Sequence, residues 1–313
     1  MRPDSTWAGS WLTLAAGMLL LFHNALVMAD SGRKWGVAPY LGVHSPKLGV
    51  LNKGALHAPF VVAGDVLQPD DSTVTAVRTL NSDLPTIDSG AYAGLEFHLN
   101  LNDKHALFLG MGSWEGSSSG VSVGEFPLQG TVNDVIYDRK VNISYTDFFF
   151  GWKHRVYQRG NVRLFTRFSL HELFDFDYRD ENVLLFTEGT AQGFRRIFRT
   201  ESHSTGVLML QPAISAEYFV RDWWSVGFDI GYQFGIEKFV PTLHATDSDF
   251  IEGTDGVTVN ISSFNPPVGN IGGLAQYKSD GNLCTQATEA TCYRHLEIDL
   301  DGWKAGFRVS IYY

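Results

Sequence analysis

Hydrophobic and polar residues alternate strictly along eight segments of the chain, which is the pattern of β-strands with two different faces. The clearest segment is residues 224–236, where every second residue from Trp224 to Ile236 is apolar or aromatic and the residues between are small or polar. The eight predicted strands are residues 34–44, 91–101, 105–114, 142–157, 162–171, 206–220, 224–236 and 303–313. Strands with lipid on one side and a crowded polar lumen on the other need this division. The pattern therefore predicts an all-β fold, a closed antiparallel transmembrane β-barrel.

The links between the predicted strands alternate between short and long. The short links are residues 102–104, 158–160 and 221–223, and the long ones are residues 45–90, 115–141, 172–205 and 237–294. Bacterial barrels have short periplasmic turns and long extracellular loops, and an even strand number places both chain ends on the periplasmic side. A three-residue link pairs residues of equal parity, so each cross-strand pair shares one face.

The number of spanning strands depends on two short segments in the first long link. Residues 60–67 and 72–80 flank a turn-like Gln-Pro-Asp-Asp sequence. They form either a hairpin in the loop or two more spanning strands, which would make ten. Spanning takes about 9–11 residues, and these segments are short with weak alternation, so eight strands are favoured. In residues 294–300 the apolar residues stand at even-numbered positions, whereas in residues 303–313 they stand at odd-numbered positions. Either a bulge near residues 301–302 shifts the alternation, or residues 294–300 form a separate loop hairpin.

Composition and the N-terminal sequence indicate the cellular compartment of the protein. Charged residues are 19% of the chain, aromatic residues 13%, and the net charge of −10 argues against a nucleic-acid partner. Arg2, the apolar stretch of residues 11–22 and the small residues up to Ala29 predict a cleaved signal peptide over residues 1–29. The mature chain, residues 30–313, is then a single barrel domain in an oxidising compartment. It has no apolar stretch of 18 residues, so a closed barrel is the remaining way to cross a membrane.

The chain resembles the small bacterial outer-membrane barrels of the OmpA/OmpX/OmpW-like group. The resemblance rests on the signal peptide, the eight alternating strands and the final strand GWKAGFRVSIYY, and it covers most of residues 34–313. It implies a bacterial outer-membrane location and contact with outer-membrane lipid. It also implies that the barrel-assembly machinery reads the last strand through Phe307, Val309, Ile311 and Tyr313. Phe is the commoner last residue in that group, so Tyr313 is a slight departure.

Charged residues on the inward-facing rows are the candidate functional site. An eight-stranded barrel has an interior that side chains fill, and buried charges must be paired. We therefore predict a salt-bridged plug; the alternative is a gated or narrow polar pathway. The candidate residues are Glu96, His98, Asp147, Glu217, Asp229, Lys153, Arg155, Arg163, Arg167, Lys304 and Arg308. The short link places Arg155 directly opposite Arg163, a like-charge pair that needs a carboxylate or a bound anion nearby.

The last long link carries two further candidate features. Cys284 and Cys292 are expected to form a disulfide in the oxidising compartment, and a metal site is less favoured because no second Cys pair accompanies them. Four acidic residues in the same link are interpreted as a solvated loop rather than a Ca²⁺ site, because they do not match an EF-hand. They are Asp247, Asp249, Glu252 and Asp255. No metal or cofactor is expected.

The leading functional hypothesis is a non-enzymatic outer-membrane barrel with a plugged or narrow lumen. Its large extracellular loops would contact a surface, a ligand or a partner on the bacterial cell surface, because loops on a rigid scaffold commonly carry function. One alternative is a narrow, porin-like channel for small solutes. Another is an outer-leaflet enzyme that modifies lipid or protein, which requires a nucleophile with a positioned base. The pairs His171–Glu172 and His203–Ser204 do not meet that requirement, because adjacent strand residues point to opposite faces.

Overall fold

The computed structural model describes most of the chain that follows the predicted signal peptide. The described residues are 34–53, 55–57, 60–67, 73–81, 83–128, 131–189, 192–204, 206–236, 239, 244–251, 259–260 and 298–313. Within these ranges nearly all structure is β, besides a turn of helix α2 (Val50–Lys53) and a 3₁₀ turn η1 (Ala55–His57). No helix of these ranges is long and apolar enough to cross a membrane. The predicted signal peptide and the Cys284–Cys292 disulfide lie outside the described residues and stay predictions.

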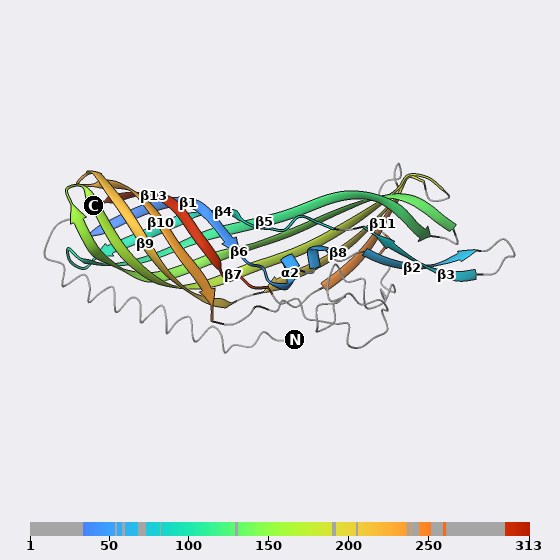
Figure 1. Cartoon of the computed structure of the whole chain (residues 1–313), viewed down its shortest axis with the longest axis horizontal. Helices are drawn as coiled ribbons and strands as arrows, with labels where there is room; N and C mark the ends of the chain where they lie inside the picture. Colours follow the sequence, from blue (N-terminus) through green and yellow to red (C-terminus); the bar gives the residue numbers. More distant parts are fainter. Residues whose placement is uncertain are drawn as a thin grey trace.

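Eight antiparallel strands form a closed ring (Figure 1). They are β1 (Trp35–Pro46), β4 (Gly90–Asn100), β5 (His105–Leu128), β6 (Thr131–Arg159), β7 (Val162–Phe186), β9 (Val207–Arg221), β10 (Trp224–Gly235) and β13 (Gly302–Tyr312). Each strand pairs with the next in this order, and β13 pairs with β1 to close the ring. The ring confirms the eight predicted strands and the predicted closed antiparallel barrel.

The two short segments of the first long link form a hairpin of their own. Strands β2 (Phe60–Leu67) and β3 (Thr73–Leu80) pair only with each other among the described strands and make a two-stranded sheet. The hairpin contacts β5 and lies far from the ring, near the end of the long strands (Figure 1). This confirms that the two segments do not span the membrane.

Strands β5, β6 and β7 continue far beyond the ring (Figure 1). Strand β6 has 29 residues, against the roughly 9–11 that cross a bilayer. Three further strands join the edge of this sheet: β8 (Phe194–Ser204), β11 (His244–Ile251) and β12 (Val259–Asn260). We call the part of the sheet beyond the ring the extension. The prediction that residues 115–141 and 172–205 are loops was therefore wrong, because polar residues on the inner row hide the alternation there.

The sheet leaves the ring at a β-bulge around Asp175. The β6–β7 register shifts between the pair Thr146–Phe174 and the pair Ser144–Asp177, and Asp175 has φ of 53°, a left-handed conformation that Asp tolerates better than most residues. Before the bulge β7 pairs with β9, and after it β7 pairs with β8. Bulges bend strands and re-aim side chains, so this one separates the barrel from the extension.

Tight turns join the strands at the other end of the ring, where the C-terminus lies (Figure 1). The link at residues 102–104 has three residues as predicted, whereas the other two links are two-residue loops at residues 160–161 and 222–223. Gly160 has φ of 56°, the left-handed conformation that glycine adopts without strain. A bulge beside each two-residue loop restores equal parity along the rest of the hairpin.

One of these bulges changes the surroundings of a predicted charge pair. Val156 is the extra residue of β6, so Arg155 pairs with Phe165 and Arg163 pairs with Gln158. The prediction that Arg155 lies directly opposite Arg163 was therefore wrong. A three-residue link without a bulge would place the two arginines opposite each other, and nothing in the local alternation reveals the extra residue.

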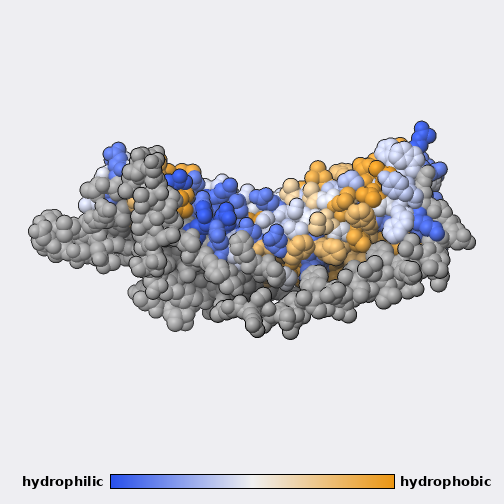
Figure 2. Space-filling model, turned by 180° about the vertical axis from the view of Figure 1, so that it is seen from behind, coloured by the Kyte–Doolittle hydropathy of each residue, from blue (hydrophilic) through white to orange (hydrophobic). Residues whose placement is uncertain are grey.

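The side chains that point away from the ring are apolar and exposed. Leu41 on β1 is 63% exposed and Phe307 on β13 is 64% exposed. Figure 2 shows apolar side chains gathered over the barrel end of the molecule. Exposed aromatic residues lie near both ends of the ring: Trp35, Trp223, Tyr313 and Trp303. A closed ring with such a belt suits lipid; the barrel is a transmembrane barrel of the bacterial outer membrane, with its tight turns on the periplasmic side.

Two buried clusters continue the interior beyond the ring. The first covers the extracellular mouth of the barrel and includes Leu51, Leu56, Trp114 and Ile298. Ile298 and Leu300 are buried in this cluster, and Ile298 bridges Phe239. Residues 294–297 lie outside the described residues, so the choice between a bulge and a loop hairpin for residues 294–300 stays a prediction. The second cluster lies in the extension and includes one residue of the β2–β3 hairpin, Leu80; its other members are Phe126, Val135, Tyr137, Leu184 and Phe186.

Candidate functional site

Six charged side chains from six different strands meet in the lower, periplasmic half of the lumen. We call this cluster the plug; its members are Glu96 (β4), Lys153 (β6), Arg167 (β7), Glu217 (β9), Asp229 (β10) and Arg308 (β13). Each faces inward because period-two alternation places it on the row opposite the lipid-facing side chains. The plug holds three carboxylates and three cations, so its formal charges balance.

Arg308 connects the members of the plug. Its guanidinium lies 2.5 Å from a carboxylate oxygen of Glu217, 3.0 Å from one of Asp229 and 3.4 Å from one of Glu96. Lys153 Nζ donates a second hydrogen bond to Glu217, at 2.5 Å, and Arg167 pairs with Glu96. Buried charges are stable only when paired and hydrogen-bonded in this way, so the plug ties opposite walls of the barrel together.

A second polar cluster surrounds Asp147 in the upper half of the lumen. The Asp147 carboxylate accepts hydrogen bonds from Tyr92 Oη at 2.6 Å, Lys304 Nζ at 2.8 Å and His171 Nδ1 at 3.0 Å. Tyr40 Oη donates to Tyr92 Oη at 3.2 Å. Asp147 is fully buried, and these three donors compensate its charge.

Ser169 extends this second cluster into a hydrogen-bonded chain. Ser169 Oγ lies 2.7 Å from His171 Nε2, and His171 Nδ1 lies 3.0 Å from Asp147. With the ring proton on Nδ1, donated to Asp147, Nε2 accepts the Ser169 hydroxyl proton. This is the bonding order of a Ser-His-Asp triad, in which the carboxylate fixes the tautomer of the base. All three side chains are buried.

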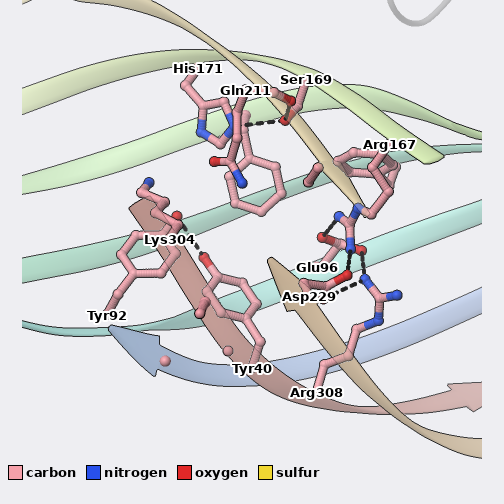
Figure 3. A pocket seen from close by; sticks show the side chains of 16 residues that line it. Tyr40, Tyr92, Glu96, Arg167, Ser169, His171, Gln211, Asp229, Lys304 and Arg308 are labelled. Atoms are coloured by element: carbon pink, nitrogen blue, oxygen red, sulfur yellow. Dashed lines mark hydrogen bonds and ion pairs between the residues drawn. The ribbon is translucent and has the colours of Figure 1, made fainter. Parts of the chain in front are cut away.

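A cavity of about 70 Å³ separates the plug from the Asp147 cluster. Figure 3 shows Glu96, Arg167, Asp229 and Arg308 on one side of it and Ser169 with His171 on the other. A water molecule needs roughly 10–15 Å³ of such volume, so the cavity has room for several waters or a very small solute.

The extracellular mouth is covered above these clusters. Leu48, Leu51 and Leu56, from the segment after β1, are fully buried against Trp114 and the upper barrel wall. Trp114 Nε1 donates to the carbonyl oxygen of His44 at 3.1 Å, which fixes the indole under this cover. The described part of the lumen is thus closed by apolar packing at the top and by ion pairs below.

The structure brings most of the predicted site residues together. Glu96, Asp147, Lys153, Glu217, Lys304, Arg308 and His98 are buried in the lumen. His98 Nε2 lies 3.1 Å from Glu96 Oε1 but is not aligned for a hydrogen bond. Arg155 and Arg163 stay apart from the plug and line the periplasmic mouth.

Several residues of the Asp147 cluster were missed as site residues. His171 shares the inward row of β7 with Arg167, and its partner Ser169 lies between them on the same row. Tyr40 and Tyr92 also face inward, where Tyr40 packs over Gly94, a position at which a Cβ would lie 2.3 Å from the Tyr40 hydroxyl. The usable signal was the run of polar residues at every second position of β7.

The extension contains a buried ion pair of its own. Arg139 on β6 and Asp180 on β7 form two hydrogen bonds, of 2.7 and 3.1 Å, and Arg139 Nη1 donates to the Leu56 carbonyl at 3.3 Å. Burial lowers the pKa of Arg139, but the Asp180 carboxylate outweighs burial and raises that pKa above its ordinary value. Burial also raises the pKa of the neighbouring Tyr178 phenol. The pair joins the extension to the cover over the barrel.

A metal site has no support in the described residues, where no group of three or more His, Cys, Asp or Glu side chains could hold an ion. Asp247 and Asp249 belong to β11, and the other two acidic residues of the predicted solvated loop, Glu252 and Asp255, lie outside the described ranges. The choice between an acidic loop and a Ca²⁺ site therefore stays a prediction.

No family model matches the chain, and no curated protein matches its sequence. Among solved structures, it is similar to the outer membrane protein OprG from Pseudomonas aeruginosa, at 8% identity and a TM-score of 0.35, over 91% of this chain and 98% of that one. It is also similar to CarO from Acinetobacter baumannii (10% identity, TM-score 0.30, 71% and 92% of the two chains). A third is the outer membrane protease OmpT from Escherichia coli (7% identity, TM-score 0.30, 89% and 97%).

Proposed function

We propose that this chain is a small outer-membrane barrel of the OmpA/OmpX/OmpW-like group, whose closed membrane part anchors an extracellular β-sheet extension. The barrel is the scaffold, and the extension and the loops around it contact a surface, a ligand or a partner. The observation that carries the proposal is the double closure of the lumen, by the plug below and by the buried cover above. A solute pathway would need an open lumen, and the cavity of about 70 Å³ is too small for one.

The extension supports the second half of the proposal. Strands β5 to β7 run 24, 29 and 25 residues, more than twice the length that a bilayer needs. The extension has its own buried cluster and its own buried ion pair, so it is a rigid platform. Binding residues are commonly carried on loops held by such a scaffold.

A liposome-swelling assay tests the proposal against the channel alternative. Folded protein is incorporated into liposomes, and swelling is followed in iso-osmotic solutions of small sugars and amino acids. We expect the swelling rate of empty liposomes, while a general porin in parallel liposomes swells them rapidly. Swelling that depends on solute size would show an open pathway and would overturn the closed-barrel proposal.

The Ser169–His171–Asp147 chain favours a second candidate function, hydrolysis of a small ester. Ser169 Oγ would attack the ester carbonyl carbon, and His171 Nε2 would take the hydroxyl proton and pass it to the departing alcohol oxygen. Water would then attack the acyl-serine, releasing the acid and restoring the hydroxyl. Gln211 lies beside Ser169 in the same cavity (Figure 3). The candidate requires that a reagent reach this cavity through the closed barrel.

A fluorophosphonate probe tests this second candidate. Such a probe phosphonylates an activated serine hydroxyl. The candidate predicts labelling that is lost in Ser169→Ala and His171→Gln and kept in Ser215→Ala, because Ser215 is equally buried in the lumen but contacts Arg308 rather than a histidine. Folded wild type that stays unlabelled, or labelling that survives Ser169→Ala, would remove hydrolysis as a candidate.

A further inference from the structure

An open pocket of about 550 Å³ lies at the periplasmic mouth of the barrel, below the plug. It is bounded by the turn at residues 102–104 and by the lower ends of β6, β7 and β9. Four cationic side chains line it: Lys104, Lys153, Arg155 and Arg163. A pocket of this size is in the range of small-molecule sites. It faces the periplasm, so the closure of the lumen above does not block it.

Arg163 is held in position by stacking on an aromatic ring rather than by a close ion pair. Its guanidinium stacks over the ring of Phe219 at 3.8 Å, and Phe219 in turn stacks on Tyr312 with ring centroids 5.6 Å apart. Its Nε is buried and has no hydrogen-bond partner among the described residues. Stacking fixes the plane of a guanidinium and leaves its edge donors available. Arg163 therefore offers an oriented guanidinium whose Nε donor has no acceptor among the described residues.

Arg155 lines the same pocket as Arg163. Among the described residues no carboxylate lies within ion-pair distance of either guanidinium, although Glu217 and Asp103 attract Arg163 from further away. The Glu217 carboxylate at the inner end is already bound by Lys153 and Arg308. Asp103 and Asp222 also line the pocket, and they form no ion pair with either arginine. Arg155 and Arg163 act on each other as like charges, and an anion bound between them would relieve that repulsion.

We propose that the periplasmic mouth is a binding site for a phosphate group, held between Arg155 and Arg163. Guanidinium forks from two residues that line one pocket suit the several acceptor oxygens of a phosphate, and Lys104 lines the same pocket. The phosphate belongs either to a free phosphorylated small molecule of the periplasm or to the headgroup of an inner-leaflet lipid. This site goes beyond the proposed anchoring function, because it lies at the opposite end of the barrel from the extension.

Calorimetry on the full-length folded protein tests the site. Inorganic phosphate is titrated into protein in nanodiscs of phosphatidylcholine alone. We expect wild type to bind phosphate, and Arg155→Gln/Arg163→Gln to bind at least about tenfold more weakly, since one charge-assisted hydrogen bond accounts for about that factor. The matched control is Arg159→Gln/Arg221→Gln, which removes the same charge from exposed arginines at the same end of the barrel but outside the pocket. The control should bind phosphate like wild type.

A second arm separates the two sources of phosphate. In nanodiscs that also contain phosphatidylglycerol, a lipid ligand would be retained by wild type in native mass spectrometry and would weaken the binding of added phosphate. If the ligand is a free small molecule, no phosphatidylglycerol would be retained in native mass spectrometry and the affinity for added phosphate would stay the same. The variant Arg163→Lys, which keeps the charge and loses the stacked fork, should bind phosphate with intermediate affinity. Absence of phosphate and lipid binding by folded wild type, or equal losses in the two double variants, would overturn the site.

Discussion

Glu217 is the residue on which the closure of the barrel depends most directly. Its carboxylate accepts hydrogen bonds from Lys153 and Arg308, each at 2.5 Å, and from Tyr312 Oη at 3.2 Å. These donors come from two strands, β6 for Lys153 and β13 for Arg308 and Tyr312. Loss of the carboxylate would leave two buried cations without this shared partner, and an uncompensated buried charge is strongly destabilising.

We predict that Glu217→Ala lowers the free energy of unfolding by about 3–5 kcal/mol, the usual cost of removing one partner of a buried ion pair. Urea unfolding of the protein in lipid vesicles, followed by tryptophan fluorescence, measures this. Glu115→Ala is the control, because Glu115 is exposed on β5, and it should change the stability by no more than about 0.5 kcal/mol. Equal effects of the two substitutions would show that the plug does not stabilise the barrel.

Period-two alternation in the sequence is sufficient to place each candidate side chain on the inward row. The pairing of those side chains depends on register, and register depends on bulges that leave no clear local trace. Val156 is an ordinary apolar residue in the sequence, yet its bulge separates Arg155 from Arg163. The Ser169–His171–Asp147 chain likewise requires knowledge of how β6 lies against β7, which the spacing within one strand does not supply.

At the scale of elements, the Arg139–Asp180 pair joins β6 to β7 in the extension. Arg139 also contacts the cover over the barrel, through the Leu56 carbonyl. Tyr178 and Asn182 also donate to Asp180, at 3.5 and 3.1 Å. The pair is buried on the inner face of the extension. The same polar residues interrupt the apolar row of these strands, so alternation alone predicts a loop where the extension lies.

We predict that Arg139→Met weakens the extension by about 3–5 kcal/mol, because Asp180 then stays buried without its cation. Limited proteolysis should cut β6 and β7 beyond the ring much faster than in wild type, while the heat-modifiable gel mobility of the folded barrel is unchanged. Arg139→Met/Asp180→Leu removes both charges and should regain most of the protease resistance, since apolar replacement of a whole buried pair is often neutral. A double variant cut faster than the single one would contradict this explanation.

At the scale of the whole molecule, one sheet performs two tasks. Its lower part closes into a ring with a lipid-facing belt, and its upper part opens at the Asp175 bulge into the extension. Strand number, closure and the direction of the barrel follow from alternation and from link lengths, which are local properties of the sequence. The extension depends on β8 joining β7 and on a buried ion pair between strands, which are long-range properties that local patterns do not reveal.

Conductance in a planar lipid bilayer tests the closed barrel most directly. Protein verified as folded and inserted is held at a series of voltages and compared with a porin in the same membrane. The account predicts no discrete current steps, because the plug and the cover close the lumen at two levels. Reproducible steps whose size changes when Asp147→Asn or Arg167→Gln alters the lumen charge would show that ions pass these side chains, and would contradict the account.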